Sequence, residues 1–120
     1  MAVVYCPRTH HYFGHPRYRF AEMNNAGVTI AIATDGRSSN PDLNLLSDLR
    51  AAARWHTDVD PSIILRAGTL TAAEALGCEK KRGSLTVGKQ ADMISVPVDA
   101  RVADPWTALF ESDAEVQRVF

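Results

Sequence analysis

The chain has 120 residues, of which 46% are hydrophobic and 22% charged, close to the average of folded globular proteins. Intrinsic disorder is excluded, because it requires few apolar residues and a large net charge. The 13 Lys and Arg against 14 Asp and Glu give a net charge of −1, so charge predicts no binding to nucleic acid or to anionic membranes. The length is that of one small domain.

Two further features of the sequence concern its environment. No apolar run approaches the roughly 20 residues that span a bilayer, and the first five residues are too short and uncharged for a signal peptide. Cys6 and Cys78 lie far apart and indicate reduced thiols, with a single disulfide as the alternative. We therefore expect a cytoplasmic protein.

The first part of the chain predicts a strand, a loop and a helix. Residues 2–6 are a continuous apolar run, typical of a strand that is buried on both faces. Residues 7–18 contain two prolines, a glycine, three histidines and no acid, and they predict a locally basic loop. Residues 19–25 can form a short helix that ends at the Ala26-Gly27 pair.

The clearest strand spans residues 28–34, which are apolar and rich in β-branched side chains. After a polar loop, Asn40 is the expected N-cap of a helix that begins at Pro41 and has an apolar stripe through about His56. We expect His56 either to interact with the negative end of the helix dipole or to lie at the surface. Strand, helix, strand and helix in this order indicate a parallel α/β architecture.

The rest of the chain changes character near residue 77. Residues 62–67 and 71–76 predict two short helices, the second with a capping box from Thr71 to Glu74. Beyond Gly77 the pattern predicts short strands and one helical turn that holds Trp106, Leu109 and Phe110. The expected strands are residues 84–87, 91–96 and 115–120.

Asp35 is the first candidate for chemistry. It directly follows the strand over residues 28–34, and catalytic groups gather at the carboxyl ends of strands in α/β sheets and barrels. A carboxylate in this position can bind a metal or transfer a proton. Its position alone, however, favours a simple Asp35-Gly36 turn in which the side chain caps nearby amides.

The histidines of the basic loop are a second candidate. His11 and His15 have the spacing of two ligands on one helical face, but Gly14 and Pro16 argue against a regular helix there. The neighbouring arginines and aromatic residues allow an anion or nucleic-acid contact instead, which the neutral overall charge makes a weak signal. The sequence contains no nucleophile elbow and no phosphate-binding glycine loop.

Several segments in order resemble one known family. They are Cys6-Pro7-Arg8-Thr9-His10, Ala26-Gly27-Val28 running into Ala33-Thr34-Asp35-Gly36, Ser38-Ser39-Asn40, residues 69–77, and Gly83-Ser84-Leu85 through Ala91-Asp92. The ordered set is similar to the C-terminal part of the metal-dependent amidohydrolases, in the branch of chlorohydrolases and cytosine- or guanine-deaminase-like enzymes. The resemblance covers nearly the whole chain.

The resemblance implies a fold and a set of site residues. Residues 1–77 would be the last two strand–helix units of a (β/α)8 barrel, and residues 78–120 part of a small composite β-sandwich. Asp35 would match the family's strand-eight aspartate, which binds the catalytic metal and relays protons, and this favours a functional Asp35. His10 and Ser39 would lie against the substrate, and Ser39 and Asn40 match a Ser-Asn pair that structures the rim of the family's active site. Arg8 matches a recurrent position to which the resemblance assigns no role.

The implied activity is hydrolysis of non-peptide C–N bonds, most simply deamination of a heterocyclic or amidine-like small molecule with zinc or iron. The family's other histidine ligands have no counterpart here, since the resemblance begins at strand seven. We therefore expect this chain alone to be inactive, and it need not bind a metal. The alternative is a catalytically silent partial domain that self-associates to cover its open strands, because two strands cannot close a barrel of eight.

Overall fold

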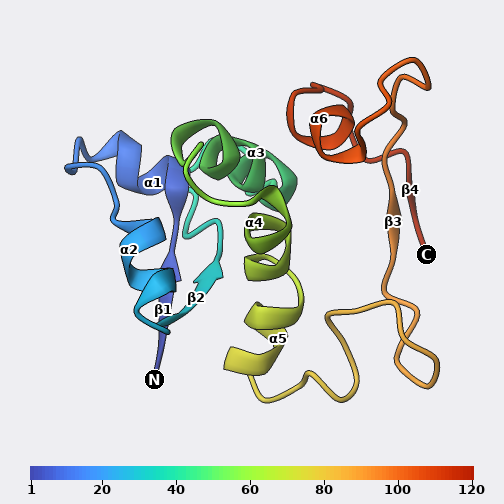
Figure 1. Ribbon diagram of the computed structural model, residues 1–120, viewed down its shortest axis with the longest axis horizontal. Helices are drawn as coiled ribbons and strands as arrows, with labels where there is room; N and C mark the ends of the chain where they lie inside the picture. The colour runs from blue at the N-terminus through green and yellow to red at the C-terminus, as the bar shows by residue number, and fades with distance from the viewer.

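The computed structural model describes residues 1–120, which form four strands and six helices (Figure 1). In chain order these are β1 (Ala2–Tyr5), α1 (Pro7–Tyr12), α2 (Phe20–Asn25), β2 (Thr29–Ile32), α3 (Leu45–Trp55), α4 (Pro61–Ala67), α5 (Leu70–Ala75), β3 (Ile94–Ser95), α6 (Pro105–Phe110) and β4 (Arg118–Val119). The mixed α/β content and the strand–helix–strand order of the first half agree with the predicted class. None of the helices has the length and apolar character needed to cross a bilayer.

Strands β1 and β2 form a two-stranded parallel sheet, in which Ala2 pairs with Thr29 and Tyr5 pairs with Ile32. Side chains alternate between the faces of a strand, so Tyr5, Ile30 and Ile32 share the face that the helices cover. On the opposite face Val4 is 60% exposed. The second face is thus exposed at Val4 and buried at its partner Ala31, and no further strand pairs with either edge of the sheet.

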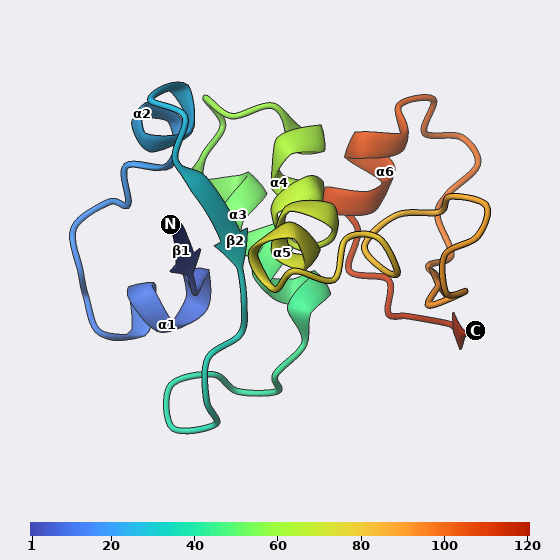
Figure 2. The same ribbon diagram turned by 90° about the horizontal axis from the view of Figure 1, so that it is seen from below.

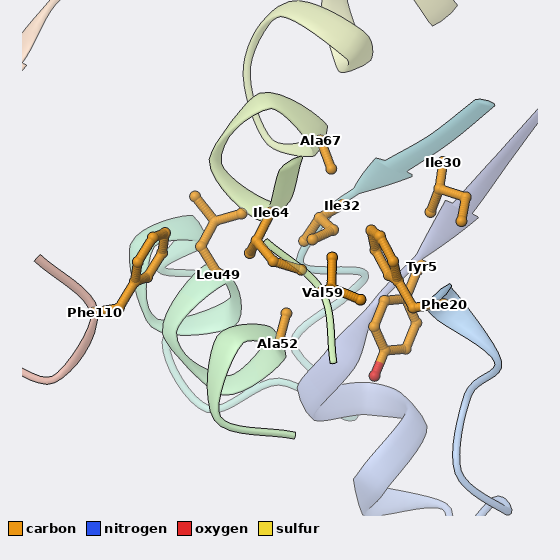
Figure 3. Packing of buried hydrophobic residues seen from close by; sticks show 10 residues of the cluster. All are labelled: Tyr5, Phe20, Ile30, Ile32, Leu49, Ala52, Val59, Ile64, Ala67 and Phe110. Carbon is orange, nitrogen blue, oxygen red and sulfur yellow. The ribbon is translucent and has the colours of Figure 1, made fainter. Parts of the chain in front are cut away.

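The hydrophobic core lies between this sheet and the helices that follow it (Figure 3). Ile64 of α4 is fully buried, and Leu49 and Ala52 of α3 pack in the same cluster. At Gly68, which follows α4, an added Cβ would lie 2.6 Å from a methyl carbon of Leu49. A side chain at this position would therefore force the Leu49 side chain to move. Ten buried residues form the cluster: Tyr5, Phe20, Ile30, Ile32, Leu49, Ala52, Val59, Ile64, Ala67 and Phe110.

The C-terminal region attaches to this core through α6. Phe110 is buried in the core cluster, and Nε of Arg50 in α3 donates a hydrogen bond of 2.9 Å to the carbonyl oxygen of Leu109. The predicted helical turn around Trp106 is therefore confirmed. Strands β3 and β4 pair antiparallel at one side of the molecule, away from the parallel sheet (Figure 1).

One predicted element was wrong, and two predicted helices begin differently from the prediction. The basic loop begins as helix α1, because Pro7 occupies its first turn and starts it without needing a side-chain cap. Helix α3 begins after Asn44, whose side chain accepts from the Ser47 amide, instead of at Asn40. Helix α5 follows Thr69 and lacks a side-chain cap, so the capping box at Thr71 does not form.

The predicted strand over residues 84–87 is also absent, and β3 and β4 are only two residues long. The side chains of Leu85 and Val87 are 79% and 103% exposed, so this segment has no surface to pack against. A strand needs a neighbour that accepts and donates its backbone hydrogen bonds. Residues 84–87 have the composition of a strand, but no neighbouring strand pairs with them.

Candidate functional site

Asp35 lies at the edge of the sheet where both parallel strands end. It follows β2 and has a left-handed backbone, with φ of 60°, a conformation that aspartate tolerates better than most residues. The adjacent strand β1 is followed by Cys6, where burial raises the pKa of the thiol and the nearby Asp35 carboxylate raises it further. The turn thus places the exposed carboxylate of Asp35 beside the carboxyl end of β1.

Ser39 is the nearest hydrogen-bond partner of this carboxylate. Its hydroxyl donates to Oδ2 of Asp35 over 3.3 Å, and its oxygen lies 3.0 Å from Oγ1 of Thr9 in α1. Thr9 and Ser39 are both buried, whereas Asp35 is exposed. The two predicted residues Asp35 and Ser39 are therefore brought together, and Thr9 completes a short hydrogen-bonded chain back to α1.

A buried ion pair holds the loop that carries these residues. Asp48 of α3 is fully buried and accepts from Nε, Nη2 and the backbone amide of Arg8 at 3.1, 2.9 and 3.2 Å. Asn40, also buried, accepts from Nη2 of Arg8 over 3.0 Å and donates to Oδ2 of Asp48 over 2.9 Å. We refer to Arg8, Asn40 and Asp48 as the loop clamp.

The loop clamp fixes both ends of the segment between β2 and α3. Nδ2 of Asn40 donates to the carbonyl oxygen of Thr34, the residue before Asp35, over 2.9 Å. At the other end, Nη2 of Arg8 donates to the Asn44 carbonyl oxygen over 3.1 Å and pairs with Asp42 at 2.6 Å. The hydrogen bonds from Arg8 lower the pKa of Asp42 to about 2, so it stays charged. The position of Asp35 thus depends on contacts that originate in α1 and α3.

The pair of Arg8 and Asp48 in the loop clamp was not predicted, although the sequence contains a signal for it. Asp48 lies one residue before Leu49 and four before Ala52, on the apolar stripe of α3. An acidic residue on the buried face of a helix needs a cationic partner, and Arg8 on the preceding unit is that partner. The structure gives Arg8 the positioning role that the resemblance did not assign.

His10 belongs to a different cluster. Its Nε2 lies 2.7 Å from the Pro16 carbonyl oxygen, and its ring packs edge-on against Tyr5 and 5.1 Å from the ring of His15. No hydrogen bond joins His10 to Asp35 or Ser39. The three predicted site residues therefore divide into the pair Asp35 and Ser39 and the separate His10.

The prediction of a surface His56 was wrong. The ring is only 2% exposed, and its Nε2 lies 3.0 Å from the hydroxyl of Tyr5. Burial lowers the pKa of His56 and raises that of Tyr5 to about 12, so both groups are neutral near pH 7. The helix ends one residue earlier, and the chain then turns this side chain inward instead of toward solvent.

The chain does not by itself form a metal centre. No group of three or more His, Cys, Asp or Glu side chains is placed to share one ion, and both cysteines are free thiols. Asp35 is exposed and offers carboxylate oxygens, so it could supply one ligand of a site that is completed by other segments. His11 and His15 do not lie on one helix, because α1 ends at Tyr12.

Two known proteins are similar to this chain in sequence. The 5-methylthioadenosine/S-adenosylhomocysteine deaminase of Moorella thermoacetica is 38% identical over 103 residues, which are 80% of this chain and 24% of that protein. The S-triazine hydrolase of Gordonia rubripertincta is 37% identical over 82 residues, or 62% of this chain and 17% of that protein. The chain thus spans about a quarter or less of the length of these relatives.

Solved structures give the same result. An adenosine deaminase from Xanthomonas campestris with bound zinc superposes with a TM-score of 0.88 and 32% identity, over 99% of this chain and 30% of that one. The Escherichia coli guanine deaminase, at 19% identity, shares the fold with a TM-score of 0.82. The family described as Amidohydrolase family matches residues 1–120. The chain therefore belongs to the amidohydrolase family, and the proteins similar to it include deaminases and a triazine hydrolase.

Proposed function

We propose that this chain is the part of a metal-dependent hydrolase that carries its proton-transferring carboxylate, and that the whole enzyme deaminates a heterocyclic or amidine-like small molecule. The observation that carries the proposal is the position of Asp35, exposed at the carboxyl ends of two parallel strands and hydrogen-bonded to Ser39. In this proposal residues 1–77 are the last two strand–helix units of a barrel, and residues 78–120 are part of a small β-sandwich.

Asp35 acts as general base and general acid. Its carboxylate accepts a proton from the water that attacks the carbon bearing the amine, and then returns it to the departing nitrogen, which leaves as ammonia. The hydrogen bond from Ser39 orients the carboxylate, and the loop clamp fixes the backbone on both sides of it. This preorganisation places the proton acceptor without movement of the loop.

Ser39 and His10 are the proposed substrate contacts. Ser39 can contact the substrate next to Asp35, since its hydroxyl lies 3.3 Å from the carboxylate. His10 would contact a more distant part of the substrate through Nδ1, because its Nε2 is engaged by the Pro16 carbonyl. Asp35 is also the proposed metal ligand, and a divalent zinc or iron ion would supply Lewis-acid activation of water. The remaining ligands come from outside these residues, so the chain alone is expected to be inactive.

A chimaera tests this proposal. This chain would replace the matching C-terminal segment of the Moorella deaminase, to which it is 38% identical, and ammonia release from a panel of aminoheterocycles would be measured. We expect the substitution Asp35→Asn, which keeps the shape and the tolerance for a left-handed backbone, to lower kcat by about a hundredfold or more. Arg37→Gln is the matched control, because Arg37 is exposed in the same loop and contacts only the Pro41 carbonyl. Full activity in the Asp35→Asn chimaera would show that Asp35 is not the base.

A catalytically silent partial domain that self-associates is the second candidate. The observation that favours it is the β1–β2 sheet, whose edges pair with no further strand and where Val4 is 60% exposed. Exposed strand edges pair readily with other strands. Sedimentation velocity at increasing concentration would show a dimer that Val4→Lys dissociates, and a chain that stays monomeric throughout would contradict this candidate.

A further inference from the structure

A cavity of about 490 Å³ lies between α1, the loop that follows it and the C-terminal end of α3. Its lining includes four histidines and two arginines and contains no carboxylate. Asp35, Ser39 and Thr9 do not line it, so it is separate from the proposed general base, but it shares His10 with the proposed substrate contacts. Its volume lies in the range of sites for small organic ligands.

Flat rings form the walls of this cavity. The imidazole of His11 stacks on the indole of Trp55, with ring centroids 4.8 Å apart and planes inclined by 29°. Tyr18 stacks on Tyr5 with centroids 4.0 Å apart and planes within 5°. Such surfaces accept a planar ring by stacking or edge-on contact.

The polar groups of the cavity are mostly donors that lack a partner. Arg54 forms no hydrogen bond or ion pair within the chain, and the buried hydroxyl of Tyr18 has no partner. Arg17 is paired with Asp58 at 2.7 Å, but both side chains are at least half exposed, so a ligand can compete for it. Tyr5 and His56, which also line the cavity, are hydrogen-bonded to each other. The guanidinium of Arg54 and the hydroxyl of Tyr18 are therefore free to donate hydrogen bonds to a ligand.

This donor set fits an anion and not a metal cation. No three of the lining histidines are placed to share one ion, and no carboxylate is present to offset an added positive charge. A guanidinium in contrast binds a carboxylate through two parallel hydrogen bonds.

We propose that this cavity binds a small planar aromatic carboxylate, with its ring among Trp55, His11 and Tyr18 and its carboxylate on Arg54. The inference does not depend on the role of Asp35, since that residue lies outside the cavity.

Titration calorimetry of the 120-residue chain tests the proposal, with indole-3-acetate as the probe and indole-3-acetamide as its neutral counterpart. We expect saturable one-to-one binding of the acetate, at least about tenfold tighter than that of the amide, since only the acetate can form the charge-assisted pair. Equal affinities for the two probes, or no saturable binding of the acetate, would overturn the proposal.

Three variants locate the site. Arg54→Gln should weaken acetate binding by about tenfold. The variant should still fold, because Arg54 is exposed and its removal leaves no other group without a hydrogen-bond partner. Arg37→Gln removes the same charge elsewhere and should leave the affinity unchanged. Asp35→Asn should also leave it unchanged, and a loss of binding in that variant would place the ligand at the proposed catalytic position and contradict a separate site. Unchanged affinity in Arg54→Gln would equally overturn the assignment.

Discussion

Residues 1–77 and residues 78–120 differ sharply in how they are buried. Of the 22 buried residues, only Ala108 and Phe110 lie beyond residue 77, although that region holds more than a third of the chain. Its apolar side chains are present but exposed, as Val87 and Val119 show. Figure 2 shows the compact group of β1, β2 and the first helices on one side and the extended C-terminal segments on the other.

The difference follows from what each region can pair with inside the chain. In the first region a helical connection returns the chain to place β2 beside β1, and the helices α3 and α4 cover one face. In the second region the strand-like segments find only two-residue partners. Apolar composition is therefore not sufficient for a core, because each strand also needs a neighbour within reach.

The largest predicted effect concerns the loop clamp of the first region. Arg8→Met leaves the fully buried Asp48 without its cation, and we expect the free energy of unfolding in urea to fall by about 4 kcal/mol. The matched change in the second region is Arg101→Met, where the pair with Asp99 is exposed. That variant should unfold like the parent, and an equal loss in both variants would contradict the contrast between the regions.

Two isoleucines provide the next comparison. Ile64→Ala removes a fully buried side chain and should lower the free energy of unfolding by about 3 kcal/mol. Ile94→Ala removes one that is 54% exposed in β3 and should cost less than about 1 kcal/mol. Denaturant titrations of both variants would measure the two values side by side. A cost for Ile94→Ala as large as that for Ile64→Ala would show that the second region has a core of its own.

The smallest predicted effect is a pH dependence that arises only in the first region, where all four histidines lie. Burial lowers the pKa of His56 below its ordinary value of 6.5, so the unfolded state takes up this proton at higher pH than the folded state. The contribution of neutral His56 to the free energy of unfolding is therefore complete above pH 6.5, and it declines as the pH falls toward the lowered pKa of His56. His56→Gln should reduce this decline in urea titrations between pH 7.5 and 5.5. An unchanged slope would show that His56 is protonated equally in both states.

The sequence predicted those elements that local patterns specify. The strand β2 follows from its run of β-branched residues, the end of α2 from Ala26-Gly27, and α6 from Asp104-Pro105. The pairing of Asp35 with Ser39 could be expected only through the family resemblance, since four residues of loop do not fix a contact.

What the sequence did not predict depends on contacts between distant residues. Asp48 is hydrogen-bonded to Arg8, 40 residues away in the sequence, and His56 to Tyr5, 51 residues away. The predicted strand over residues 84–87 is absent for the opposite reason, because no other segment of the chain pairs with it. Periodicity indicates which face a residue occupies in its own element, and it does not indicate which other element lies opposite.

The central claim is that Asp35 contributes to a metal site which other segments of an amidohydrolase barrel complete. Its most direct measurement is the zinc content, after dialysis, of the Moorella chimaera, of its Asp35→Asn variant and of this chain alone. We predict about one zinc ion per chimaera, a clear loss in the variant, and no zinc above background in the isolated chain. An Asp35→Asn chimaera that retains its full zinc, or an isolated chain that holds one zinc ion and releases ammonia, would contradict the account.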